Sequence, residues 1–267
     1  MPEGDSELAR VVAYMSAHWP SAVKEEWQVP LDAYPALLEK VIADLTKDKT
    51  TNHHLTRIAG LSGSGKTTQL LPAVEAYYSS RELSPVLVAA RLFAPYHPHY
   101  QEILDFYGAS NVRRLTDEFS TIMMFLVLSA LTAAGYDIIL DVTFLDPAIE
   151  AVLVKMLSSH EYQYLVTMIA ISPIVAERHL GGRSWRHSRE TEQEFIRATS
   201  SAIAFYANTC PNTRIVLWDT YQSEPIYDGP ISASLDIFDA ASLVTEIPPH
   251  DEAALRAAKI TYFTSKI

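Results

Sequence analysis

The chain has 267 residues, 48% of them hydrophobic and 20% charged, which is typical of a globular protein that can bury a sizeable core. Its 32 acidic and 21 basic residues give a formal net charge of -11, which disfavours a nucleic-acid binder unless one cleft is locally basic. The single Cys210 excludes an internal disulfide, and the first residues lack a basic region followed by an apolar run. We therefore expect no signal peptide, no membrane span and a cytoplasmic location.

The first fifty residues are predicted to be helical, in pieces. Apolar residues recur at helical spacing around Val11 and again along Leu31–Leu45. The polar residues 46–54 are predicted to form a loop. We expect a helical extension over residues 1–50 and one larger domain over residues 51–267.

Strands and helices are predicted to alternate through the larger domain. The predicted strands cover residues 55–59, 85–90, 136–142, 164–171 and 214–217. The predicted helices cover residues 67–78, 117–134, 147–160 and 190–207, followed after a weaker pattern by an edge strand and a short helix at 251–258. This rhythm predicts an α/β fold with a mostly parallel sheet and helices on both faces.

A phosphate-binding motif separates the first strand from the first helix of this domain. Residues 60–67 read Gly-Leu-Ser-Gly-Ser-Gly-Lys-Thr and fit G-x-x-x-x-G-K-[ST] at every fixed position. Such a loop wraps main-chain N–H groups around a polyphosphate, while Lys66 reaches the outer phosphates and the Thr67 hydroxyl binds Mg²⁺. We expect ATP or GTP to be held by Gly60, Ser62, Gly63, Ser64, Gly65, Lys66, Thr67 and Thr68.

The helix that follows the motif contains a proline. Pro72 cannot donate a main-chain hydrogen bond, and its ring collides with the preceding turn. We expect a kink or a shortening of the regular helix at this point.

Asp141 is the strongest acidic candidate. It closes the apolar run Ile138–Leu140, as the carboxylate of a Walker B motif does, and would face the ligand at the carboxyl end of a parallel strand. There it would hold Mg²⁺ or accept the proton of an acceptor hydroxyl; the alternative is a helix cap or a loop carboxylate. Thr143 would orient a substrate or a phosphate, unless it is a turn residue.

One segment is dense in arginine, with Arg178, Arg183, Arg186 and Arg189. A mobile arginine can stabilise the charge that develops on a phosphoryl group in transfer. We expect this catalytic role of Arg183 and Arg186, which flank Trp185 just after a Gly181-Gly182 hinge. The alternative is a solvated helix face with ordinary ion-pair partners.

Two further segments match the motifs of a known family in residue type and spacing. The matching residues are Phe93, His97, Pro98 and Tyr100 in the first segment, and Gly135, Tyr136, Asp141 and Thr143 in the second. Together with the phosphate-binding motif, residues 50–220 resemble the zeta toxins. Known members are P-loop kinases that transfer the γ-phosphate of ATP to a sugar hydroxyl of UDP-N-acetylglucosamine, and several belong to toxin–antitoxin pairs. The resemblance implies the fold of a P-loop kinase, a small-molecule acceptor, contact of His97 with that substrate, and a protein antitoxin as partner.

The chain departs from the family at three positions. Arg91 stands where the family has its catalytic aspartate, Ala94 where it has a basic residue, and Phe125 where it has an acidic substrate contact. An arginine cannot be a general base, because its pKa stays above about 12. Arg91 would instead grip an anionic substrate, or form an ion pair with a nearby carboxylate. The sequence thus predicts a small-molecule kinase, or alternatively a catalytically inactive ATP-binding protein that acts through a partner.

Overall fold

The computed structural model describes residues 24–144, 147–179, 189–244, 246 and 248–267. These residues form a six-stranded sheet in the order β2-β3-β1-β4-β5-β6, parallel except for the edge strand β6. The strands are β1 (His54–Gly60), β2 (Val86–Val88), β3 (Ile138–Asp141), β4 (Gln163–Ala170), β5 (Arg214–Asp219) and β6 (Tyr227–Pro230). The predicted α/β fold with a mostly parallel sheet is confirmed.

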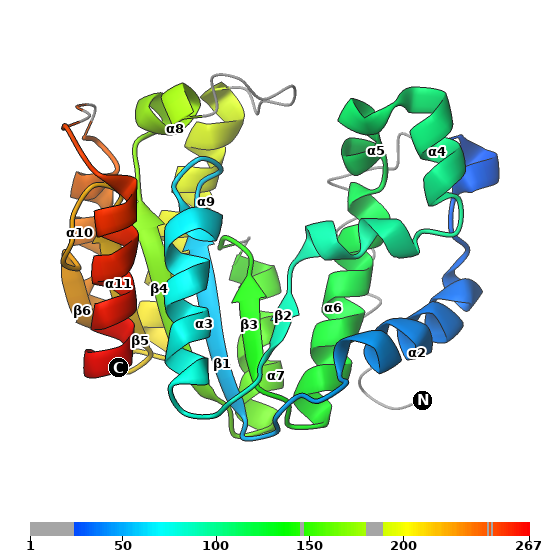
Figure 1. Cartoon of the computed structure of the whole chain (residues 1–267), viewed down its shortest axis with the longest axis horizontal. Helices are drawn as coiled ribbons and strands as arrows, with labels where there is room; N and C mark the ends of the chain where they lie inside the picture. The colour runs from blue at the N-terminus through cyan, green and yellow to red at the C-terminus, as the bar shows by residue number, and fades with distance from the viewer. Residues whose placement is uncertain (1–23, 145–146, 180–188, 245, 247) are drawn as a thin grey trace.

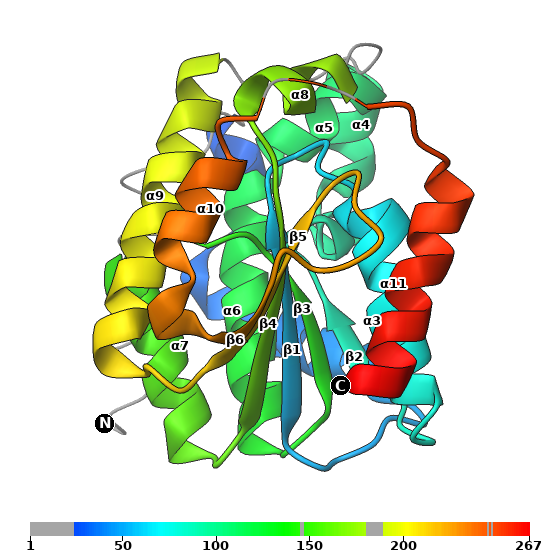
Figure 2. The same cartoon turned by 90° about the vertical axis from the view of Figure 1, so that its left-hand side faces the viewer.

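Helices cover both faces of the sheet, as predicted. Figure 2 shows α3 and α11 on one face, and α6, α7 and α9 on the other. The described helices are α2 (Tyr34–Leu45), α3 (Leu71–Ser79), α4 (Tyr100–Tyr107), α5 (Ala109–Leu115), α6 (Asp117–Ala133), α7 (Pro147–Ser159), α8 (Pro173–His179), α9 (Arg189–Thr209), α10 (Leu235–Ala241) and α11 (Glu252–Lys266). The short helices α4, α5, α8 and α10 were not among the predicted elements.

The central strand β1 is buried on both faces, and its side chains alternate between the two faces of the sheet. Leu55 packs into the core under α2, α6 and α7. Ile58 packs on the opposite side, with Val74 of α3 and Phe263 of α11. A strand buried in this way reads as an almost continuous apolar run, which makes the charged Arg57 within it conspicuous.

The N-terminal helix α2 belongs to the same packed unit as the sheet. Val41 is buried against the α6 side of the core, and the Tyr34 ring lies 5.6 Å from the ring of Phe119. The predicted stripe Leu31–Leu45 is therefore confirmed as a helix from Tyr34 onward. The helical piece predicted around Val11 lies outside the described residues.

Pro72 has the predicted effect on the helix after the phosphate-binding motif. Lys66–Leu70 form a wider π-helical turn, and the regular helix α3 begins only at Leu71, with Pro72 in its first turn. Proline is tolerated there because the first main-chain N–H groups of a helix have no partner within it. Among the described residues, no helix combines the length and apolar character needed to cross a bilayer.

Candidate active site

The phosphate-binding loop leaves the carboxyl end of β1 at Gly60, whose φ is +133°. A Cβ atom at Gly60 would lie 2.7 Å from the carbonyl oxygen of Ile169 and 2.9 Å from Oγ of Ser64. Gly63 and Gly65 also have positive φ, at +83° and +95°. The helical turn begins immediately afterwards, so the loop has a strand behind it and a helix N-terminus ahead of it, as an anion cradle requires.

Lys66 lies inside this loop and faces its main chain. Its Nζ donates to the carbonyl oxygens of Gly60, at 2.6 Å, and Leu61, at 2.9 Å. Burial lowers the pKa of Lys66 to about 8, although the nearby Asp141 carboxylate acts in the opposite direction. The ammonium of Lys66 and the carboxylate of Asp141 therefore lie within electrostatic reach of each other.

Asp141 is the last residue of β3, and its Cα partner on β1 is Ile58, two residues before Gly60. Its side chain is 3% exposed, and its Oδ2 accepts a hydrogen bond from Nη1 of Arg91 at 2.5 Å. Of the two roles expected for Arg91, the structure contains the ion pair, and Asp141 is the carboxylate concerned. The Arg91 side chain is 32% exposed.

Thr143 and His97 have different surroundings. The Thr143 hydroxyl is buried and has no hydrogen-bond partner among the described residues. His97 is 4% exposed, its Nδ1 accepts the main-chain N–H of His99 at 3.1 Å, and its ring meets that of Phe119 edge-on at 4.9 Å. Burial lowers the pKa of His97 to about 4, so the ring is neutral and packed within its own turn.

The remaining predicted residues divide into two groups. Thr67 and Thr68 lie on the exposed first turn of the helix, and Thr68 Oγ1 donates to the carbonyl oxygen of Gly65 at 3.4 Å. Arg183 and Arg186 lie outside the described residues. The hydroxyl of Thr67 and the carboxylate of Asp141 offer oxygen atoms, which are the ligands that Mg²⁺ prefers.

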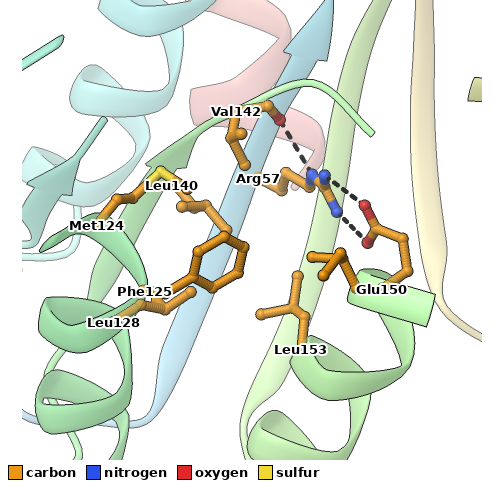
Figure 3. Close-up of a pocket in the computed structure, with 9 residues that line it drawn as sticks. Arg57, Met124, Phe125, Leu128, Leu140, Val142, Glu150 and Leu153 are labelled. Atoms are coloured by element: carbon orange, nitrogen blue, oxygen red, sulfur yellow. Dashed lines mark hydrogen bonds and ion pairs between the residues drawn. The ribbon is translucent and has the colours of Figure 1, made fainter. Parts of the chain in front are cut away.

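A buried ion pair beneath the site was not predicted. Arg57 of β1 and Glu150 of α7 are joined by two hydrogen bonds, of 2.6 Å and 2.9 Å (Figure 3). Tyr206 of α9 donates to the same carboxylate at 3.0 Å. The sequence contains a signal for this pair, because a charge stands inside an apolar strand and another inside an apolar helix, and each needs a partner when buried.

A second unpredicted contact holds the outer side of the loop. His179 of α8 donates from Nδ1 to the carbonyl oxygen of Gly63 at 2.7 Å, and its Nε2 accepts from the hydroxyl of Tyr221 at 2.6 Å. The Tyr221 ring lies 4.7 Å from the ring of His250. The loop is thereby tied to α8 and to the segment that follows β5. Figure 1 shows α8 on one side of this sheet edge and α4 and α5 on the other.

A glycine-rich loop between a central parallel strand and a helix, with a carboxylate at the end of the adjacent strand, is typical of P-loop nucleotide-binding proteins, the class that includes P-loop kinases. The Zeta toxin family model matches residues 41–228, which is most of the chain, and the chain belongs to that family.

Solved structures agree with this assignment. The structure reported for the PezAT chromosomal toxin–antitoxin system of the human pathogen Streptococcus pneumoniae matches with a TM-score of 0.67 at 17% identity, over 91% of this chain and 100% of that one. The AvrRxo1-ORF1:AvrRxo1-ORF2 structure with sulphate ions matches with a TM-score of 0.50 at 12% identity, over 98% and 86%. At these identities the matches establish the fold. No curated protein matches the sequence.

Proposed function

We propose that this protein is an ATP-dependent phosphotransferase that moves the γ-phosphate to a hydroxyl group of a small acceptor, UDP-N-acetylglucosamine or another nucleotide-type molecule. The observation that carries the proposal is the placement of Asp141 beside the phosphate-binding loop, on the strand next to β1 and within electrostatic reach of Lys66. Membership of the zeta toxin family supports the same class of chemistry.

The proposed roles follow from the positions of the side chains. The loop amides and Lys66 bind the phosphates, and Asp141 accepts the proton of the attacking hydroxyl through Oδ1, since Arg91 binds its Oδ2. Mg²⁺, held by Thr67 and, through water, by Asp141, would neutralise phosphate charge. The exposed part of Arg91 would bind an anionic group of the acceptor, with further contacts from Thr143 and the His97 turn.

A protein antitoxin is proposed as partner. The family assignment and the likeness to the structure of the PezAT toxin–antitoxin system support this proposal. The proposed location is cytoplasmic, as the sequence suggested.

The Arg91–Asp141 ion pair also favours a second candidate function. The Asp141 oxygen that the Arg91 guanidinium binds at 2.5 Å cannot at the same time accept a proton from an acceptor hydroxyl. On this alternative the chain binds ATP without transferring phosphate and acts through a partner that recognises the bound state.

Transfer of label from γ-labelled ATP decides between the two functions. The protein would be incubated with Mg²⁺ and a panel of nucleotide sugars, nucleosides and dinucleotides. We expect acceptor-dependent transfer that Lys66→Ala abolishes and Asp141→Asn reduces on the order of 100-fold or more, with ATP binding retained in Asp141→Asn. The matched control is Asp239→Asn, which alters an exposed carboxylate on α10 that is bonded to Ser200.

Two results would count against the proposal. If ATP binds but no acceptor is labelled, the regulatory alternative stands. If Lys66→Ala binds ATP and transfers phosphate as the wild type does, the assignment of the phosphate-binding loop is wrong.

A further inference from the structure

Arg57 makes more contacts than its ion pair with Glu150 requires. Its Nε donates to the carbonyl oxygen of Val142 at 3.1 Å (Figure 3). Its Nη2 donates to the carbonyl oxygen of Thr143 at 2.5 Å. The centroid of the Phe144 ring lies 4.4 Å from the guanidinium carbon. The side chain of Arg57 therefore touches three consecutive residues of the loop that follows β3.

These three residues come directly after Asp141. Because peptide bonds are trans, turning the carbonyls of Val142 and Thr143 toward Arg57 turns the N–H groups of Thr143 and Phe144 away from it. The guanidinium of Arg57 thus holds the conformation of residues 142–144, because its planar shape fixes the directions of its N–H donors. The same loop presents the buried Thr143 hydroxyl, which has no hydrogen-bond partner among the described residues.

A buried ion pair adds little net stability to a fold. Taking a guanidinium and a carboxylate out of water costs free energy, and apolar residues of similar volume often stabilise a core equally well. On the side of α6 and α7 the surroundings are apolar: Figure 3 shows Phe125, Leu128 and Leu153 near the pair. These residues help to line a cavity of about 10 Å³. That volume corresponds to roughly one water molecule, so the cavity is no ligand site. What apolar residues could not supply are the two hydrogen bonds to the loop carbonyls.

We propose that Arg57 is a positioning residue, which holds residues 142–144 so that Asp141 and Thr143 meet the acceptor in the geometry needed for transfer. This inference rests on the proposed phosphotransfer function. The proposal assigns two separate roles to β1. The strand ends in the phosphate-binding loop at Gly60, whereas the Arg57 side chain, three residues earlier, serves the acceptor side.

The test is the double variant Arg57→Met/Glu150→Leu, which removes both charges at once and leaves neither unpaired. We expect it to fold and to bind ATP within about twofold of the wild-type Kd, because the phosphate-binding loop is untouched. We expect kcat for the acceptor to fall on the order of 100-fold, which is the typical effect of a small misplacement of reacting groups. In hydrogen exchange, the amides of residues 142–144 should exchange faster than in the wild type.

The matched control for a purely structural effect is Trp218→Phe. It removes a buried hydrogen bond to Thr167 elsewhere in the sheet, and should lower stability while leaving kcat and exchange of the 142–144 loop unchanged. Should the double variant not fold, Arg57→Lys takes its place. A lysine keeps a cation opposite Glu150 but is a point charge without the planar fork, so the same two losses are expected.

The outcomes separate this inference from the proposed function. Wild-type kcat together with wild-type exchange of residues 142–144 in the variant overturns the positioning role, while the kinase assignment stands. Absence of transfer in the wild type itself overturns the function. In that case the exchange measurement still decides whether Arg57 orders the loop.

Discussion

At Gly60 a single missing Cβ atom allows β1 to turn into the phosphate-binding loop. Alanine at this position would combine a φ of +133° with a contact of 2.7 Å to the main chain of β4. We expect Gly60→Ala to lower the free energy of unfolding by about 2–4 kcal/mol and to weaken ATP binding, because main chain and loop must both shift. Urea denaturation and ATP titration measure the two effects.

Gly108 is a natural control for this substitution. Its φ is +79°, but a Cβ atom there would meet nothing within 4 Å. Gly108→Ala should therefore cost only the backbone penalty, about 1–3 kcal/mol, and leave ATP binding unchanged. Equal losses of stability and of ATP affinity in the two variants would mean that the close contact of a Cβ atom at Gly60 with the main chain of β4 affects neither quantity.

The sequence predicted the site residues whose role depends on their immediate neighbours in the chain. The eight-residue motif specifies its own turns, so the cradle and its link to a strand and a helix were predicted from spacing alone. The partners within the ion pairs were not predicted, because they are far apart in the chain: Arg91 was expected to pair with an unnamed carboxylate, and the pair of Arg57 with Glu150 was not expected at all. Arg91 and Asp141 are separated by 50 positions, and Arg57 and Glu150 by 93. Only the packing of strands and helices brings such pairs together, although an isolated charge in an apolar strand indicates that a partner exists.

At the scale of elements, the terminal helix illustrates what local pattern leaves out. The sequence predicted a helix at 251–258, whereas α11 continues to Lys266. Its start was predictable, because Asp251 caps the main-chain N–H groups of Ala253 and Ala254. Its length comes from tertiary contact: Phe263 is fully buried and stacks on Trp218 of β5 with ring centroids 6.1 Å apart. Packing of one face, more than helix propensity, stabilises most protein helices.

The docking of α11 also buries a charge. Lys259 is fully buried, donates to the carbonyl oxygen of Gln222 at 3.0 Å, and lies 5.0 Å from the centroid of the Trp218 ring. Burial lowers the pKa of Lys259 to about 8, against the opposing charge of Asp219. In the unfolded chain the same group titrates near 10.4. Between these two pH values the unfolded state binds more protons, so stability must rise with pH.

We therefore expect the wild type to gain stability relative to Lys259→Met as the pH rises from 8 to 10.5. The gain should be about 2–3 kcal/mol, because each unit of pKa shift corresponds to about 1.4 kcal/mol. Urea denaturation of both proteins across this range measures it. Arg256→Met on the exposed side of α11 is the control, and its difference from the wild type should not depend on pH in this way. A constant difference for Lys259→Met would mean that the ammonium keeps its solution pKa in the folded protein.

For the whole molecule, the alternation of strands and helices was enough to predict the fold class. It was not enough to predict the strand order, because the rhythm says only that successive parallel strands are linked by crossovers. In the structure β3 lies between β1 and β2, and this order brings Asp141 next to the phosphate-binding loop. The candidate site thus arises where elements distant in the chain meet at the carboxyl edge of the sheet.

A buried carboxylate lies at the opposite end of the parallel strands, where they begin. Asp137, immediately before β3, is buried and accepts hydrogen bonds from the hydroxyl of Thr50 at 2.5 Å and the side-chain amide of Asn52 at 2.9 Å. The main-chain N–H groups of Asn52 and His54 donate to it as well, each at 3.2 Å. Burial raises the pKa of Asp137, but these hydrogen bonds lower it more, so the net shift is downward.

A carboxyl whose folded pKa is depressed stabilises the protein above its unfolded pKa of about 3.9, and this contribution is lost as the pH falls through the folded value. Asp137→Asn should therefore lower the free energy of unfolding at pH 7 by about 2–3 kcal/mol, and the difference from wild type should shrink at the acid end. ATP affinity should not change, because Asp137 lies at the edge of the sheet opposite the phosphate-binding loop. Urea denaturation from pH 7 to pH 3 and ATP titration test both statements, with Asp236→Asn on α10 as the control. A loss of ATP binding in Asp137→Asn would show that the two edges are coupled through β3, and that the site depends on the whole sheet and not on its carboxyl edge alone.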